Sequence, residues 1–323
     1  ESNFKTKVKA TAYRTQERGG VIWIYMGPDQ NAAPRLPDLE ANMQPEGEGT
    51  TSIFQRECNY MQALEGDIDT GHTVFLHTGS VQVEAAPAGS WSYYALKTRA
   101  LHFAAVDTNV GTMYTANRPA GEGTYHRIAQ FLFPFYAMIP TGVLGLEIRV
   151  RAWVPIDDGH TFGLSMSKVG QRQRPRDPTV LLPNTTDWLG RFRAEATVAN
   201  DYQIDRGKQR RNESFTGLPS ITLEDQAVTE SMGEIYDRTQ EHLGTSDTMI
   251  IRSRRRLIEA AKALRDTGAP PPGSQNPEFY GVRTGGIVLP KDVSWVEGSA
   301  ELRKGFVDHP ELSRDVLGGV PAV

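Results

Sequence analysis

The sequence predicts an α+β fold, in which an antiparallel sheet carries its helices on one side. Between residues 81 and 168, five β-rich segments follow one another, each bounded by Gly, Pro, Asp or Asn. In the last of them, LEIRVRAWV (146–154), apolar and charged residues alternate, as in a strand with one solvated face. Two helical patterns come after residue 220. The expected order is strands, one helix, a multi-strand sheet and then the C-terminal helices, and such segregation of helices from the sheet is typical of this class.

The residues before this sheet show weaker patterns. A hairpin is expected around Gly19-Gly20, with VIWIYM (21–26) as a buried strand. A loop rich in Pro and acidic residues (28–50) leads to the strand-like TTSIFQ. A helical spacing of apolar residues then runs from Met61 to Phe75.

After residue 220, cap and stop signals define two helices. The first is expected to run from Thr222, a suitable N-cap, to a stop at Gly244. The second ends at Gly268 and has one apolar face. The Pro-rich segment APPPGSQNP then predicts a linker into a C-terminal tail, whose apolar GIVL suits packing on a neighbouring subunit.

Composition excludes several classes of protein. The net charge of the 323 residues is -4, which gives no electrostatic reason to bind nucleic acid or an anionic membrane. No apolar run reaches the length of a transmembrane helix. A single cysteine, Cys58, excludes an intrachain disulfide and any Cys-rich metal site within these residues. A cytoplasmic location is expected.

The most informative stretch is ALEGDIDTGHTVFLHTGS (63–80), where His72 and His77 follow a cluster of carboxylates ending at Asp69. Five residues on a regular helix rotate by about 500°, so the two imidazoles would lie about 140° apart. They can converge only if the helix ends between them or frays at Gly71. The spacing alone leaves ordinary structural histidines open. Two imidazoles with one carboxylate would form the facial triad of non-heme Fe(II) oxygenases.

Five segments together resemble one family. ECNYMQALEGDIDTGHTVFLHTGS (57–80) resembles the mononuclear-iron motif of Rieske non-heme iron oxygenases, in the phthalate dioxygenase-like branch. The resemblance extends from residue 8 to about residue 265. The other segments that carry it are AYRTQERGGVIWIYMGP (12–28), FLFPFYAMIP (131–140), VPIDDGHTFGLSM (154–166) and residues 200–247.

The resemblance implies a function and the residues that perform it. It implies that His72, His77 and Asp225 bind a mononuclear Fe(II), which uses O2 as co-substrate. It also implies that Asp69 conducts electrons from the Rieske cluster of a neighbouring subunit. A homo-oligomeric ring follows, a trimer or a pair of stacked trimers, served by an NAD(P)H-dependent flavin/iron–sulfur reductase. The implied fold is a helix-grip (Bet v 1/START-like) sheet wrapped around a long C-terminal helix.

One departure from the family concerns the first domain. A Rieske [2Fe–2S] cluster needs two cysteines and two histidines in paired motifs, and these residues hold one cysteine. We therefore expect residues 1–27 to be strands that follow a missing N-terminal Rieske domain. Residues 28–268 are expected to form the catalytic domain, and residues 269–323 the linker and tail.

The expected substrate is an aromatic carboxylate that undergoes cis-dihydroxylation. Such a substrate needs basic anchors, for which the candidates are Arg99, His102, Arg127, Arg149 and Arg151. Two alternatives stay open. One is an O-demethylating monooxygenase of a methoxy-aromatic acid, and the other is a non-catalytic helix-grip module that binds a ligand.

Overall fold

A computed structural model describes residues 3–77, 93–94, 101–169 and 179–312. Its centre is an eight-stranded sheet with the order β3-β9-β8-β7-β6-β5-β4, in which β10 pairs with β6 beside this path. All the pairings in the sheet are antiparallel. The strands are β3 (Gly49–Arg56), β4 (His102–Thr108), β5 (Gly111–Ala120), β6 (Gly123–Leu132), β7 (Tyr136–Met138), β8 (Arg149–Pro155), β9 (Thr161–Lys168) and β10 (Gly285–Pro290).

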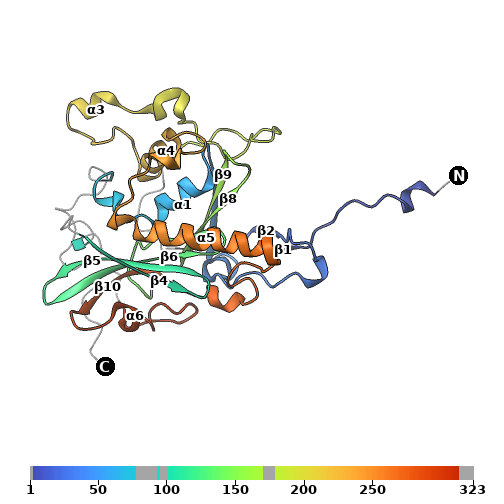
Figure 1. The fold of residues 1–323 in the computed structure, drawn as a ribbon. Coiled ribbons are helices and arrows are strands. Elements are labelled where there is room, and N and C mark those ends of the chain that lie inside the picture. Colours follow the sequence, from blue (N-terminus) through green and yellow to red (C-terminus); the bar gives the residue numbers. More distant parts are fainter. Residues whose placement is uncertain (1–2, 78–92, 95–100, 170–178, 313–323) are drawn as a thin grey trace.

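The longer helices lie on one face of this sheet (Figure 1). The helices are α1 (Tyr60–Ile68), α3 (Arg206–Arg210), α4 (Ile221–Ser231), α5 (Thr248–Thr267) and α6 (Trp295–Gly298). Shorter 3-10 turns are η1 (Phe4–Thr6), η2 (Gln30–Ala32), η3 (Glu40–Asn42), η4 (His72–Val74), η5 (Val198–Gln203), η6 (Arg238–Gln240), η7 (Thr245–Asp247) and η8 (Pro277–Tyr280). None of the described helices is both long and apolar enough to cross a membrane.

Alternation along the strands divides the core into two layers. Tyr114 and Phe131 point to the helical face, where they pack with Ile68 of α1 and Met249 of α5. Their neighbours in the strands point the other way, because successive side chains of a strand lie on opposite faces. This second layer is closed by residues of β10 and the C-terminal segment. The α+β class with a large antiparallel sheet is thus confirmed.

Most of the predicted strands are present. The segments expected around residues 102, 112, 125 and 148 correspond to β4, β5, β6 and β8, whereas most of WSYYALKT (91–98) lies outside the described residues. The hairpin at Gly19-Gly20 is also present, as β1 (Thr15–Arg18) and β2 (Val21–Ile24). The prediction that VIWIYM is buried is wrong, because Ile22 and Ile24 are 69% and 56% exposed. The hairpin forms a separate two-stranded sheet.

The first predicted helix is shorter than expected. Ser220, rather than Thr222, is its N-cap, and the Ser220 hydroxyl accepts the Leu223 N–H. The helix ends at Ser231 instead of Gly244. Gly233 has a φ of +94°, a left-handed conformation that terminates helices and that glycine adopts without strain. The second helix, α5, ends as predicted at Gly268, which has a φ of +72°.

The C-terminal tail was wrongly expected to lie apart from the domain. Its GIVL segment belongs to β10, which pairs antiparallel with β6. Ile287 and Leu289 are only 3% and 5% exposed. The apolar residues of this segment therefore complete the sheet of their own chain, and need no neighbouring subunit to cover them.

Candidate metal centre

The two histidines converge because α1 ends before them. Asp69 has extended backbone angles and closes the helix. Its Oδ1 accepts the Gly71 N–H at 2.6 Å, and its Oδ2 accepts the His72 N–H at 2.9 Å. This turn starts η4 at His72. The centroids of the His72 and His77 rings are 5.1 Å apart, which a continuous helix would not allow.

Helix α4 brings a carboxylate to these two rings. Asp225 Oδ1 lies 3.2 Å from His77 Nε2 and 3.5 Å from His72 Nε2. Within the described residues, these three side chains form a group whose potential ligand atoms all lie within 4.8 Å of one another. Helix α4 is tied to α1 by the buried Gln62, whose Nε2 donates to the Thr229 carbonyl at 2.9 Å.

The Nδ1 nitrogen of each imidazole, on the side of the ring away from Asp225, also lies close to a carboxylate oxygen. His72 Nδ1 is 3.1 Å from Asp69 Oδ2. His77 Nδ1 is 2.6 Å from Oε2 of Glu224, a residue that the sequence did not single out. The other oxygen of Glu224 accepts the Thr216 hydroxyl at 2.6 Å. In metal sites, such partners fix the orientation of a ligating imidazole and raise its basicity.

The charges of the centre favour a bound cation. Burial by itself lowers the pKa of His72, but hydrogen bonds with Asp225 and Asp69 outweigh it and raise the pKa to about 9. The pKa of His77 is raised against burial by Asp225 and Glu224. Although burial raises the pKa of Asp225, the two imidazoles hold it well below its usual range. Two imidazole nitrogens and one carboxylate oxygen, with both outer nitrogens already bonded, fit the donor set of Fe(II).

One candidate substrate anchor lies next to this centre. Arg127 on β6 is buried, and its Nη1 donates to Thr70 Oγ1 at 2.6 Å. Thr70 follows Asp69 directly in the chain and also contacts the hydroxyl of Tyr114. Arg127 is therefore in contact with the turn that separates Asp69 from the histidines.

The other candidates are placed differently. Arg151 Nη1 donates to Asp67 at 2.7 Å, and Asp67 also accepts the Trp153 indole N–H, so this arginine ties α1 to β8. Arg149 donates to the Thr141 hydroxyl at 3.0 Å. His102 is exposed at the start of β4. Arg99 lies outside the described residues.

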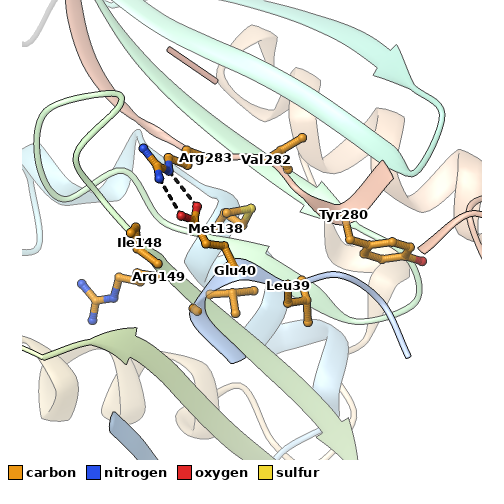
Figure 2. Close-up of a pocket in the computed structure, with 10 residues that line it drawn as sticks. Leu39, Glu40, Met138, Ile148, Arg149, Tyr280, Val282 and Arg283 are labelled. Carbon is orange, nitrogen blue, oxygen red and sulfur yellow. Dashed lines mark hydrogen bonds and ion pairs between the residues drawn. The ribbon is translucent and has the colours of Figure 1, made fainter. Parts of the chain in front are cut away.

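A small pocket elsewhere in the fold shares no residue with this centre. It is lined by residues of η3, β7, β8 and the segment that leads into β10. Figure 2 shows the Glu40–Arg283 ion pair at its wall, with the Arg149 guanidinium pointing away from that pair. Both carboxylate oxygens of Glu40 accept from Arg283, at 2.5 and 2.7 Å, and both side chains are buried. The pair links η3 to the C-terminal segment.

The chain is similar to known oxygenase subunits over nearly all of its length. The model of the family described as LigXa C-terminal domain like matches residues 24–315. The 3-chlorobenzoate-3,4-dioxygenase oxygenase subunit of Comamonas testosteroni is 37% identical in an alignment 324 residues long, which covers 95% of this chain and 74% of that protein. The phthalate 4,5-dioxygenase oxygenase subunit of Pseudomonas putida is 32% identical over 283 residues, which cover 82% of this chain and 62% of that protein.

A third relative is named as an O-demethylase subunit rather than a dioxygenase subunit. The 5,5'-dehydrodivanillate O-demethylase oxygenase subunit of Sphingobium sp. is 28% identical over 263 residues, which cover 80% of this chain and 54% of that protein. The chain thus spans between about half and three quarters of the length of these relatives.

Proposed function

Because the chain belongs to the LigXa C-terminal domain-like family, and with it to the oxygenase subunits of Rieske-type oxygenases, we propose that it hydroxylates an aromatic substrate with O2 at a mononuclear Fe(II). His72, His77 and Asp225 would bind the iron. The observation that carries this proposal is the meeting of the two Nε2 atoms of His72 and His77 with one carboxylate oxygen of Asp225 in α4. Iron in such a three-ligand site has open positions at which O2 can be activated.

The surrounding residues orient this donor set. Asp69 and Glu224 hold the Nδ1 side of the two rings, which directs both Nε2 atoms toward Asp225. Residues 28–268 would form the catalytic domain together with β10. In this proposal the sheet grips α5 as in helix-grip folds. A Rieske domain that precedes residues 1–27 in the whole protein would hold a [2Fe–2S] cluster, supplied with electrons by an NAD(P)H-dependent reductase.

The proposed substrate is an aromatic carboxylate, and the proposed outcome is cis-dihydroxylation. The names of two relatives, a 3-chlorobenzoate dioxygenase and a phthalate dioxygenase, support this class. Arg127 supports it as well, since a guanidinium beside the iron-binding turn suits a carboxylate. O-demethylation of a methoxy-aromatic acid is the second candidate, favoured by the similarity to an O-demethylase subunit. Product analysis separates them, because dioxygenation yields a cis-diol and demethylation releases formaldehyde.

Replacing Arg127 with Gln should weaken the preference for a carboxylate. We expect kcat/KM for a benzoate-type acid to fall by about tenfold to a hundredfold, the effect of one hydrogen bond to a charged group. The value for the methyl ester of the same acid should change much less. Arg127→Lys, which keeps the charge, should retain part of the preference. An unchanged ratio between acid and ester in Arg127→Gln would show that another residue binds the carboxylate.

The whole protein is proposed to form a head-to-tail ring, as a trimer or a pair of stacked trimers. In such a ring the Rieske cluster of one subunit can reach the Asp69 side of the next, and a heterologous interface closes on itself. Light scattering of the whole protein at micromolar concentration should give a mass of three or six subunits. A monomer under these conditions would contradict the ring.

A further inference from the structure

The two imidazoles of the centre have carboxylate partners in different surroundings. The side chains of His72 and Asp69 are 24% and 22% exposed, and their atoms are 3.1 Å apart. The side chains of His77 and Glu224 are 5% and 1% exposed, and their atoms are 2.6 Å apart. Water can replace a carboxylate at the first pair, whereas a buried group that loses its partner at the second stays unsatisfied.

Glu224 is held in place from both sides. One oxygen faces His77 Nδ1 and the other accepts the Thr216 hydroxyl. It directly precedes Asp225 in α4, so a single helical turn supplies both a proposed ligand and the group that orients another ligand. The position of Glu224 relative to Asp225 is therefore fixed by the helix itself.

We infer that Glu224 positions the His77 imidazole for metal binding, and that binding depends more on Glu224 than on Asp69, whose pair with His72 is more exposed. The inference rests on the proposed function, because it assumes that His77 binds a metal ion. A carboxylate at Nδ1 holds a ring proton on that nitrogen, which leaves Nε2, on the Asp225 side of the ring, as the nitrogen that binds a metal ion. The short buried contact also fixes the ring before the metal arrives, which removes an ordering cost from binding.

Metal affinity tests this without a turnover assay. The metal-free protein is titrated with Co²⁺ alone, and binding is followed by visible absorption and by calorimetry. Glu224→Gln should bind Co²⁺ about tenfold to a hundredfold more weakly than wild type, the usual effect of losing a partner of a ligating histidine. Asp69→Asn changes the more exposed pair for comparison, and it should weaken Co²⁺ binding less than Glu224→Gln does, because water reaches that pair.

A second variant and a second readout address the ring itself. Thr216→Val keeps every proposed ligand and Glu224, and should weaken Co²⁺ binding by about threefold to tenfold, because it removes one hydrogen bond that holds Glu224 rather than a bond to the imidazole itself. In the Co²⁺ protein, each imidazole Nδ1–H gives a paramagnetically shifted proton signal that exchanges with water. Glu224→Gln and Thr216→Val should move the signal of His77, whereas Asp69→Asn should move that of His72.

The outcomes separate this inference from the proposed function. Wild-type Co²⁺ affinity in a folded Glu224→Gln protein would overturn the inference and leave the proposed iron site intact. If Glu224→Gln does not fold, wild-type affinity and an unmoved His77 signal in Thr216→Val overturn it equally. Failure of the wild-type protein to bind Co²⁺, or binding that survives His72→Ala, would contradict the proposed function and the inference with it.

Discussion

Replacing His72 with Ala should abolish iron binding, and all turnover with it, while the protein stays folded. The variant removes one of the three proposed donor atoms, and two remaining ligands do not hold the metal. Because the His72 side chain is 24% exposed, its loss leaves little unfilled space in the core. Iron content of the purified protein, with circular dichroism to follow the fold, measures both expectations.

The same change at His77 should remove iron and turnover as well, but with a cost in stability. His77 is buried, and its removal takes the imidazole partner from Glu224 Oε2, while Oε1 keeps the Thr216 hydroxyl. A buried oxygen that loses its partner costs about 1–3 kcal/mol of the free energy of unfolding. Denaturant unfolding of the two metal-free variants should therefore show His77→Ala to be the less stable one.

His160→Ala is the matched control for both histidine variants. His160 Nδ1 lies 2.8 Å from Asp157, so it is also an imidazole beside an aspartate three residues earlier. It is not a member of the group formed by His72, His77 and Asp225. This variant should retain iron in full. Stoichiometric iron in either His72→Ala or His77→Ala would show that the metal ligands are wrongly assigned.

From the sequence alone, the two histidines could be predicted to meet only if the helix ended before or between them. Their spacing requires a break in the helix, and Asp69 and Gly71 are present to make one, but acids and glycines end helices in many places where no site exists. The structure supplies the detail that decides it, since both oxygens of Asp69 accept backbone N–H groups of the turn. Asp225 could be assigned only through the family motif, because nothing local links it to the histidines.

Glu224 could not be predicted as a site residue because its burial depends on how α4 packs against the rest of the fold. In the sequence it is one more acidic residue in the first turn of a helix, where acids are common. It becomes buried only because α4 lies against α1 and the histidine segment. The strand β10 was missed for a similar reason, since a Pro-rich segment precedes it and its partner β6 is far away in the chain.

The length of the first C-terminal helix was misjudged for a local reason. Both Gly233 and Gly244 are plausible helix stops, and the apolar residues between them gave no clear sign that the period had ended. The chain uses the first glycine, after which Asp237 caps the short turn η6. Boundaries of this kind depend on packing, whereas α5, with its strong apolar face and a single glycine stop at Gly268, could be predicted from its sequence.

Asp69→Asn should slow turnover by at least about a hundredfold while leaving iron bound, the upper end of effects seen for partners of ligating histidines. Both oxygens of Asp69 already accept hydrogen bonds within the turn. Oδ1 accepts the Gly71 N–H, and Oδ2 lies within hydrogen-bond distance of His72 Nδ1. Each carboxylate oxygen has two lone pairs, however, and the side chain is 22% exposed. It can still accept a bond from a Rieske histidine of a neighbouring subunit.

Asparagine retains one oxygen for the turn, and asparagine is well tolerated in such turns, so the fold should survive. What it loses is the charge and the second acceptor, through which electrons would pass between the two metal centres. Single-turnover kinetics, with the Rieske domain attached and its cluster reduced beforehand, measure this step directly. Asp157→Asn, at the similar Asp157–His160 pair, should leave the rate unchanged. Cluster oxidation and product formation at the wild-type rate in Asp69→Asn would show that Asp69 only closes α1 and orients His72, and electrons would then need another route into the centre.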